Sequence, residues 1–377
     1  MSVSRRQFLK TSAVTAAAVP FSTAVGIDYC EAATNSSVDL SMGFPPDAVR
    51  LNYNENTLGP SPKAVEGALA GVRQGYRYAL SALLKSPVAE YHDVDDDWVL
   101  MGTGSSELLR LAPIAFGRNG GNVVTGLETW GGLLAVAENL GLEVRRLNLN
   151  KDTGYAFDVE RMLAAVDSET RIFMVVSPNN PTGATLSYTD IKHIADSLPG
   201  NVLFVLDQAY IHYYDGGRSG ADLVKEGYRN VLVTQTFSKA FALAGLRCGY
   251  GLAHPDVLNE IKKFGTGPAS INIAGYGAIL GSLDDPEHAI RSRSYVQKTR
   301  KYYQQQFAEL GVNEISGPPP FILFEAGDRS QDIYDELLAR NIFITHGRTW
   351  NMPDYLRVSY GRESENEAFF SALKSIL

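Results

Sequence analysis

The residues around Lys239 offer the clearest chemistry in this sequence. Lys239 lies in the segment Thr236-Phe237-Ser238-Lys239-Ala240, among small and hydroxyl-bearing side chains, and Arg247 follows eight positions later. A lysine amine can hold an aldehyde as an imine, and hydroxyls together with an arginine can bind a phosphate. The pattern therefore predicts a site for pyridoxal phosphate, with Thr236, Ser238 and Arg247 around the phosphate. Taken alone, Lys239 would be interpreted as a solvated surface charge, as most lysines are, and the surrounding residues change that interpretation.

A second candidate for phosphate binding is the turn Gly102-Thr103-Gly104-Ser105-Ser106. It follows an apolar run and opens a helical stretch over residues 106–116. Backbone amides at the start of a helix, together with the positive end of the helix dipole, form a cradle for an anion. Gly104, Ser105 and Ser106 are the candidate residues. Gly and Ser before Glu107 also describe an ordinary capped helix, so the turn by itself leaves both interpretations open.

Two further polar groups follow apolar runs. Asn180 lies in Ser177-Pro178-Asn179-Asn180-Pro181-Thr182-Gly183, where its amide could donate to a phenolate oxygen; these residue types also make an ordinary turn. Asp207 ends the run over residues 202–206, and Tyr210 comes three residues later. A buried carboxylate is costly unless it is paired with a cation, and a protonated pyridine nitrogen would serve. A helix cap or a solvated loop carboxylate is the alternative for Asp207.

Short apolar runs alternate with helical stretches, which predicts an α/β fold with a largely parallel central sheet. The elements of this fold must position the groups described above. In such a sheet the loops at the strand ends converge on a ligand, and the motifs above fall there. Helical stretches, for example residues 106–116 and 190–197, lie between the strands. The expected strands are residues 98–102, 122–125, 143–147, 171–176, 202–206, 231–234 and 249–253.

The chain reads mainly as helix after residue 255, and residues 291–307 form a charged stretch long enough to bridge two domains. Mixed strand and helix return from residue 320 onward. These changes predict an N-terminal segment over residues 34–79 that joins a smaller α/β domain, a large cofactor-binding domain over 80–285, and a small C-terminal domain over 286–377. The basic and apolar N-terminus, described below, predicts a signal peptide over residues 1–33.

In this order, the four motifs resemble those of the class I/II aminotransferases of pyridoxal-phosphate fold type I, and most of all the histidinol-phosphate aminotransferase branch. The resemblance spans about residues 50 to 360. It implies pyridoxal 5′-phosphate (PLP) as cofactor, with Lys239 forming the internal aldimine and moving the proton between the substrate's α-carbon and the cofactor. It also implies that Asp207 keeps the pyridine nitrogen protonated and that Asn180 and Tyr210 bond the 3-oxygen.

Two aromatic residues enter through the same resemblance. Trp130, in Glu128-Thr129-Trp130-Gly131, matches the ring that stacks on the cofactor, where this branch more usually has tyrosine. Tyr78 resembles the tyrosine that reaches the phosphate of the neighbouring subunit's cofactor, which implies a homodimer with shared sites. The phosphate-binding set implied by the resemblance is the backbone of Gly104, Ser105 and Ser106 with the side chains of Thr236, Ser238 and Arg247.

The resemblance also supplies candidates for substrate binding. Arg357, in Tyr355-Leu356-Arg357-Val358-Ser359, looks like the arginine that binds the substrate's acid group, and a guanidinium fork suits a carboxylate. Arg348 matches a second arginine of the branch, and Asn56 lies in a segment, Asn52-Tyr53-Asn54-Glu55-Asn56, that covers the site. Surface ion pairs and a polar loop are the alternatives. Gln208 replaces a common glutamate, at a position not expected to touch the reacting atoms.

The resulting prediction is transamination between an amino acid, or an amino-acid-like amine, and a 2-oxo acid. The same cofactor residues serve cyclases, lyases, decarboxylases and oxidases of this fold, so these reactions stay open as the alternative. A regulator that binds the cofactor without turnover would carry a basic DNA-binding domain ahead of the aminotransferase part. This chain has a different N-terminus.

That N-terminus, Ser4-Arg5-Arg6-Gln7-Phe8-Leu9-Lys10, resembles the twin-arginine export signal, and an apolar run too short to span a membrane follows it. It predicts transient contact with the twin-arginine machinery and a periplasmic or secreted location for a protein that crosses folded; a frayed basic helix is the alternative. Histidine biosynthesis is cytoplasmic, so an exported member is not expected to be the biosynthetic enzyme, and the substrate stays open.

Composition narrows the classes of partner. The 377 residues carry a net charge of −8 and no long basic stretch follows the N-terminus, so nucleic acid and anionic membranes are not expected ligands. Cys30 and Cys248 are far apart and the six histidines are scattered. Neither a disulfide framework nor a metal site is predicted.

Overall fold

The structure is a computed structural model of the chain and describes residues 42–78, 84–265 and 271–377. All elements named below belong to one compact unit, Asp47–Leu377. The predicted signal peptide over residues 1–33 lies outside the described residues. The predicted division of the remaining chain at residues 79/80 and 285/286 stays a prediction.

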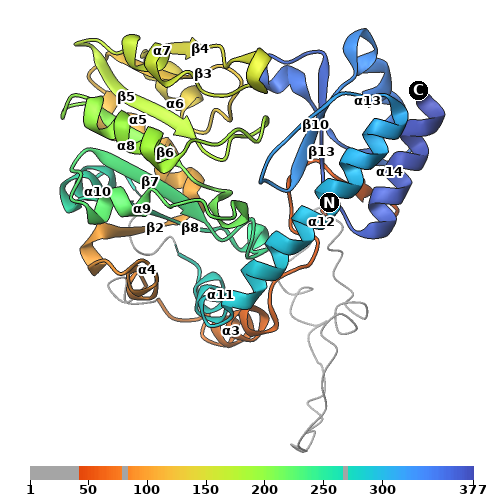
Figure 1. The fold of residues 1–377 in the computed structure, drawn as a ribbon. Helices are drawn as coiled ribbons and strands as arrows, with labels where there is room; N and C mark the ends of the chain where they lie inside the picture. Colours follow the sequence, from red (N-terminus) through yellow and green to blue (C-terminus); the bar gives the residue numbers. More distant parts are fainter. Residues whose placement is uncertain (1–41, 79–83, 266–270) are drawn as a thin grey trace, which may run out of the picture. The chain divides into compact units, whose positions relative to one another are not determined.

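A central sheet of seven strands, as far as the described residues go, has the order β2-β8-β7-β6-β5-β3-β4 (Figure 1). Strands β3 to β7 pair in parallel, and β8 runs antiparallel to its neighbours β2 and β7. The prediction of a largely parallel sheet is confirmed, and each expected strand is present with ends within two residues. The strands are β2 (Val99–Thr103), β3 (Asn122–Gly126), β4 (Glu143–Leu147), β5 (Thr170–Val176), β6 (Leu203–Asp207), β7 (Val231–Thr236) and β8 (Cys248–Ala253).

Helices cover both faces of this sheet (Figure 1). In β5, Ile172, Met174 and Val176 pack into one core while Phe173 and Val175 pack into the other, because successive side chains of a strand point to opposite faces. Burial on both faces explains why these strands are apolar throughout. One core includes α5 (Ser105–Gly117), α6 (Leu134–Asn139) and α10 (Pro255–Lys262); the other includes α7 (Val159–Ala164), α8 (Tyr188–Ser197) and α9 (Ala221–Lys225).

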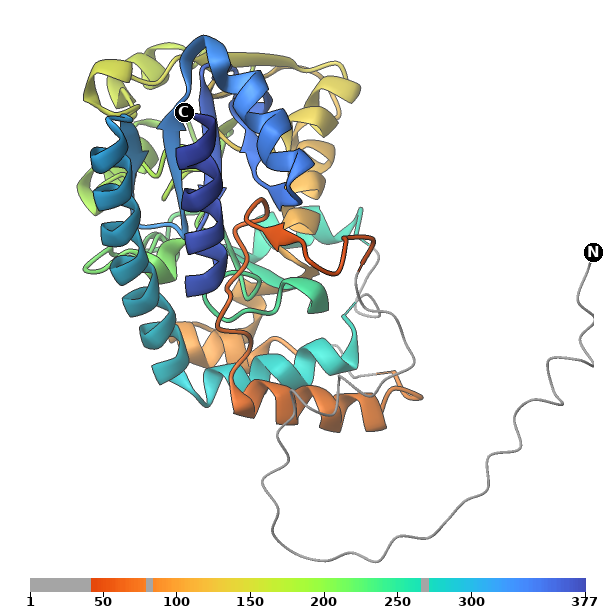
Figure 2. The ribbon, with the colours of Figure 1, turned by 90° about the vertical axis from the view of Figure 1, so that its right-hand side faces the viewer.

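A small antiparallel sheet follows in the C-terminal third, with the order β12-β13-β10-β9. Helix α12 (Pro286–Leu310) contains the charged stretch predicted over residues 291–307, and it runs from α11 to this sheet (Figures 1 and 2). Among the described residues, no helix has the length and apolar character of a membrane span. The other elements here are β9 (Glu314–Ser316), β10 (Phe321–Glu325), α13 (Ser330–Ala339), β12 (Thr345–His346), β13 (Tyr355–Ser359) and α14 (Glu363–Ile376).

Two contacts bind the N-terminal segment to distant parts of the unit. Strand β1 (Val49–Arg50) pairs in parallel with β11 (Ile342–Phe343). Helix α3 (Pro62–Arg73) packs along α11 (Ile273–Leu283), as both views show, and the short helix α4 (Ser86–His92) makes fewer contacts with α11. A Cβ added to Gly67 would stand 2.0 Å from the carbonyl oxygen of Gly277, so only glycines allow the two backbones this close.

Candidate active site

The carboxyl ends of neighbouring strands bring the predicted residues to one edge of the central sheet. Asp207 and Thr236 are the last residues of β6 and β7, and Ser177 directly follows β5. These three strands are parallel neighbours, so the loops that carry Asn180, Tyr210 and Lys239 leave from the same edge.

Lys239 is half-buried at this edge. Its Nζ donates a hydrogen bond to the carbonyl oxygen of Tyr53 at 2.8 Å and lies 5.9 Å from the centre of the Tyr210 ring. Burial, helped by the positive charge of Arg357, lowers the pKa of the Lys239 amine to about 8. A substantial part of this amine is therefore neutral near pH 8, which a solvated surface lysine would not be.

Asp207 is a buried carboxylate without a cationic partner among the described residues. Its side chain is 2% exposed and accepts a hydrogen bond from Thr234 Oγ1 at 2.9 Å. Burial raises the pKa of Asp207 to about 6, although the bonds from Thr234 and the Ala209 backbone act in the other direction. The solvated loop considered for this residue is wrong, and a protonated ring nitrogen fits as the missing cation.

Tyr210 is held by two residues that motif reasoning missed. Asn54 Nδ2 donates to the Tyr210 hydroxyl at 2.8 Å, and Ser359 Oγ donates to Asn54 Oδ1 at 2.9 Å. Asn54 is more than 150 residues from Tyr210 and Ser359 is more than 300 residues from Asn54. One local property fits the residue type: the backbone of Asn54 is left-handed, with φ of 55°, a conformation that asparagine adopts more readily than most residues.

Arg357 is a buried cation, which excludes the surface ion pair considered for it. Its side chain is 4% exposed, and the guanidinium lies 4.7 Å from the Trp350 ring centre and 5.3 Å from that of Phe321. Nη1 donates to Asn180 Oδ1 and Nη2 to the Asn52 carbonyl oxygen, both at 2.6 Å. Burial lowers the pKa of Arg357 to about 10, and no described carboxylate pairs with it. The site therefore holds a positive charge ready for an anion.

The predicted phosphate-binding residues surround the start of α5. The Gly104 amide donates to the Arg247 carbonyl oxygen at 3.0 Å, and Thr236 Oγ1 lies 2.9 Å from Ser238 Oγ. No described residue accepts the amide hydrogens of Ser105 and Ser106.

Glycines keep this region open. Gly104 has φ of +74°, and a Cβ there would stand 2.5 Å from Arg247 Nη2. A Cβ on Gly249 would stand 2.1 Å from the Ser105 nitrogen. Free amides at a helix start, two hydroxyls and a guanidinium fit the phosphate of PLP.

Trp130 belongs to a turn that is tied to the Asn180 loop. A Cβ on Gly132 would lie 1.9 Å from the Trp130 ring, so the ring rests directly on this glycine. Thr129 Oγ1 donates to Asn179 Oδ1 at 2.6 Å, and Asn179 Nδ2 donates to the Glu128 carbonyl oxygen at 2.8 Å. Asn179, which the sequence suggested only as a turn residue, thus couples the two loops.

The remaining predicted residues are Asn56, Arg348 and Tyr78. The Asn56 amide donates to the Ala240 carbonyl oxygen at 2.9 Å and to Ser292 Oγ at 2.8 Å, so it supports the Lys239 loop. Arg348 is exposed and donates to Gln331 Oε1 at 2.6 Å, and Tyr78 is 92% exposed. Substrate binding by Asn56 and Arg348 stays a prediction.

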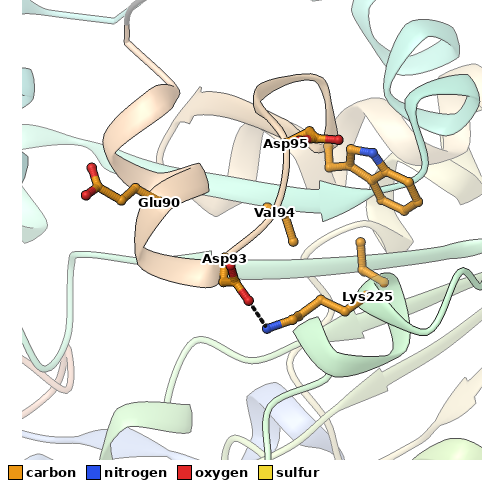
Figure 3. A pocket seen from close by; sticks show the side chains of 7 residues that line it. Glu90, Asp93, Val94, Asp95 and Lys225 are labelled. Carbon is orange, nitrogen blue, oxygen red and sulfur yellow. Dashed lines mark hydrogen bonds and ion pairs between the residues drawn. The ribbon is translucent and has the colours of Figure 1, made fainter.

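A hollow elsewhere on the surface contains none of the predicted residues. It has a volume of about 480 Å³, and Asp93 and Lys225 form an ion pair of 3.2 Å in it (Figure 3). Within the described ranges, no cluster of His, Cys, Asp and Glu could hold a metal ion. The lining residues are Glu90, Asp93, Val94, Asp95, Trp98, Val224 and Lys225.

Comparison with protein families gives two matches. A model of "Aminotransferase class I and II" matches residues 46–373. A model of the twin-arginine translocation pathway signal sequence matches residues 2–19, which lie outside the described residues. Together the matches span both the structured unit and the basic N-terminus.

Known proteins similar to this chain agree with the first match. The histidinol-phosphate aminotransferase of Symbiobacterium thermophilum is 33% identical over 88% of this chain and 91% of that protein. Histidinol-phosphate aminotransferase 2 of Pseudomonas aeruginosa is 34% identical over 89% of this chain and 91% of that protein.

Solved structures show the same fold. The histidinol-phosphate aminotransferase of Sinorhizobium meliloti in complex with pyridoxal-5′-phosphate has a TM-score of 0.81 at 23% identity, over 87% of this chain and 90% of that one. Aspartate aminotransferase from Thermus thermophilus with maleate has a TM-score of 0.79 at 21% identity, over 88% and 92%.

Proposed function

Because this chain belongs to the class I and II aminotransferases, we propose that Lys239 holds its PLP cofactor and that Arg357 binds the carboxylate of an α-amino acid that donates the amino group. The predicted family, the fold type I architecture, the PLP-dependent transaminase activity and the cofactor are confirmed by the matches described above. The roles of individual residues and the substrate are the proposal.

Arg357 is the observation that supports the substrate class most directly. Leaving a guanidinium buried without an anion is unfavourable, and two aromatic rings compensate for only part of the lost hydration. Its free Nε is buried as well. A substrate carboxylate would supply the missing negative charge in a geometry that suits the fork of the guanidinium.

The other residues act at different parts of the cofactor, including its ring nitrogen and its phosphate. When bound, PLP supplies the electron sink that makes the α-proton of an amino acid acidic. Lys239 Nζ, neutral in part near pH 8, can accept that proton and give it back at a second carbon. Asp207 holds a proton on the ring nitrogen, since its buried charge is stabilised by a cation there. Thr236, Ser238 and Arg247 anchor the phosphate.

Assembly as a homodimer with shared sites belongs to this proposal. Tyr78 is 92% exposed. The same stretch exposes Val72 and Tyr76 to 63% and 74%, and apolar side chains exposed together favour association. Tyr78 would then complete the phosphate site of the second subunit.

The twin-arginine signal indicates export. For the exported protein we infer a periplasmic or secreted location, reached in the folded state. An amino donor found outside the cytoplasm then follows, and it need not be the substrate named for the relatives.

A single-turnover experiment tests the proposed function. The PLP-loaded protein is mixed with a panel of amino acids and L-histidinol phosphate, without any 2-oxo acid, and its visible absorbance is followed. Loss of the visible band that a 2-oxo acid reverses would support transamination and identify the donor. Product formation without any lasting loss of the band would contradict it.

The role of Arg357 is tested in the same assay. Arg357→Gln should raise the donor concentration needed for half of the absorbance change by on the order of 10- to 100-fold, since a charged hydrogen bond is lost. Arg161→Gln, a change at an exposed arginine, serves as the control. An unchanged concentration for Arg357→Gln would remove this residue from substrate binding.

A further inference from the structure

Three buried side chains close a defined set of hydrogen bonds behind the cofactor site. Ser359 Oγ accepts from the Asn54 backbone amide and donates to Asn54 Oδ1, both at 2.9 Å. In this arrangement the hydroxyl of Ser359 bonds Oδ1 of Asn54, and Nδ2 of the same amide is directed at the Tyr210 hydroxyl at 2.8 Å. The exposed fractions of Ser359, Asn54 and Tyr210 are 2%, 2% and 4%.

This arrangement determines what the Tyr210 hydroxyl can do. A phenol has one hydrogen to donate, and its oxygen is already occupied as an acceptor by Asn54. No described residue accepts the hydrogen of Tyr210. A buried donor without an acceptor is unfavourable, so the hydrogen is available to a ligand at the site.

We propose that Asn54, held by Ser359, is a positioning residue that directs the Tyr210 hydroxyl hydrogen to the 3-oxygen of PLP. The proposal rests on the proposed function, in which Tyr210 bonds this oxygen. Donation from Asn54 polarises the phenol and strengthens its onward hydrogen bond, as in other chains of hydrogen bonds at low dielectric.

The same strand carries the substrate-binding and the positioning residue. Ser359 follows Arg357 by two residues in β13, so both side chains leave the same face of the strand. An anion bound by Arg357 therefore contacts the same strand whose Ser359 holds Asn54 and, through Asn54, Tyr210.

Other charges around Tyr210 act on it as well. Burial raises the pKa of Tyr210, Arg357 and the Asn54 bond lower it, and Asp207 raises it. Lys239 faces the ring from the neighbouring loop, and Tyr213 lies behind it. Removal of Asn54 leaves all four of these groups in place, so the effect of its amide can be isolated.

The expected effect is a shift in a proton equilibrium of the loaded protein. Hydrogen donation by Tyr210 stabilises negative charge on the ring oxygen. Without it, a proton on the nearby Lys239 nitrogen is held more strongly. The pH midpoint of the visible absorbance should therefore rise, by about half to one pH unit for the loss of one hydrogen bond.

The experiment titrates the absorbance of PLP-loaded Asn54→Gly from pH 6 to pH 10, a range of about two units on each side of the pKa of about 8 of the Lys239 amine. Glycine keeps the left-handed backbone of Asn54, whose φ is 55°, and removes only the amide. Ser359→Ala should shift the midpoint in the same direction by less, because Asn54 then loses its fixed orientation. Asn351→Gly, at an exposed residue with φ of 59°, is the matched control and should leave the midpoint unchanged.

A double variant separates positioning from a general loss of structure. If Asn54 acts through Tyr210, Asn54→Gly should add no further shift in a Tyr210→Phe background. An unchanged midpoint in both Asn54→Gly and Ser359→Ala, or a full additional shift in Tyr210→Phe, would overturn the proposal. If the unmodified loaded protein itself shows no pH-dependent visible band, that result contradicts the proposed role of Lys239, and the proposal for Asn54 loses its basis with it.

Discussion

Two buried charges of opposite sign dominate the site at the scale of single residues. Asp207 and Arg357 are each almost inaccessible to solvent, yet they do not pair with each other. A buried charge that lacks its partner weakens folding. Each of these residues is therefore better explained by a ligand that it binds than by a contribution to folding.

Asp207→Asn should make the cofactor-free protein more stable above pH 6. The folded-state pKa, raised from 3.8 to about 6, means that ionisation opposes folding; this cost is absent below about pH 4 and complete above about pH 6. We expect a gain of roughly 1–2 kcal/mol at pH 7.5 that disappears at pH 4, measured by urea unfolding. Turnover of the loaded variant should fall by on the order of 100-fold. Equal stability at pH 7.5 would contradict the argument.

Lys239→Ala should abolish the covalent attachment of PLP. Borohydride reduction of the loaded protein, followed by denaturation, should leave the cofactor on the unmodified chain and none on the variant. Turnover should decrease by on the order of 10²–10⁴-fold, the range for a lost proton-transfer group. Lys301→Ala, a change at an exposed lysine, serves as control. Label retained on Lys239→Ala would place the attachment at another lysine.

At the scale of elements, the strand ends explain what sequence reasoning could reach. Lys239, Asp207 and Asn180 follow apolar runs, and the parallel order of β5, β6 and β7 brings them together without further information. The roles of Asn54 and Ser359 could not be found in this way, because the segments that contain them suggest no contact between the two residues and that contact spans 305 residues. Trp350 was missed for the same reason. It becomes significant only when Arg357 lies against its ring.

Gly249→Ala tests the contact between β8 and the start of α5. The added methyl would stand 2.1 Å from the Ser105 nitrogen, so strand and helix must separate. We expect a stability loss of about 1–3 kcal/mol and PLP affinity lower by on the order of tenfold, measured by unfolding and by absorbance titration. Gly200→Ala, where an added Cβ meets nothing within 4 Å, is the control. An unchanged affinity for PLP would show that the contact between β8 and α5 does not contribute to phosphate binding.

At the scale of the whole molecule, the N-terminal segment connects the site to an exposed part of the surface. It crosses the site at Tyr53 and Asn54, packs as α3 against α11, and then presents Tyr78 to solvent. The glycine-lined contact between α3 and α11 holds the helix that precedes Tyr78 against the rest of the unit. A second subunit is the partner that our proposal assigns to it.

Mixing two inactive variants tests this assembly. A Lys239→Ala chain paired with a Tyr78→Ala chain would form one site with both changes and one site with neither. Refolding the two together should restore activity to about a quarter of the unmodified level, since half of the dimers are mixed and each has one intact site. Separately refolded variants that are combined afterwards serve as control. Activity no greater than the sum of the two would contradict shared sites.

If the protein is exported in the folded state, as proposed above, the chemistry of its sulfur matters. Cys248, the one cysteine of the described residues, is 2% exposed at the start of β8, and burial raises the pKa of its thiol to about 12. The thiolate that would attack a disulfide is therefore scarce at neutral pH. The part of the chain that the structure describes therefore needs no oxidant to form a disulfide and exposes no reactive sulfur. The same molecule can mature in a reducing compartment and persist in an oxidising one.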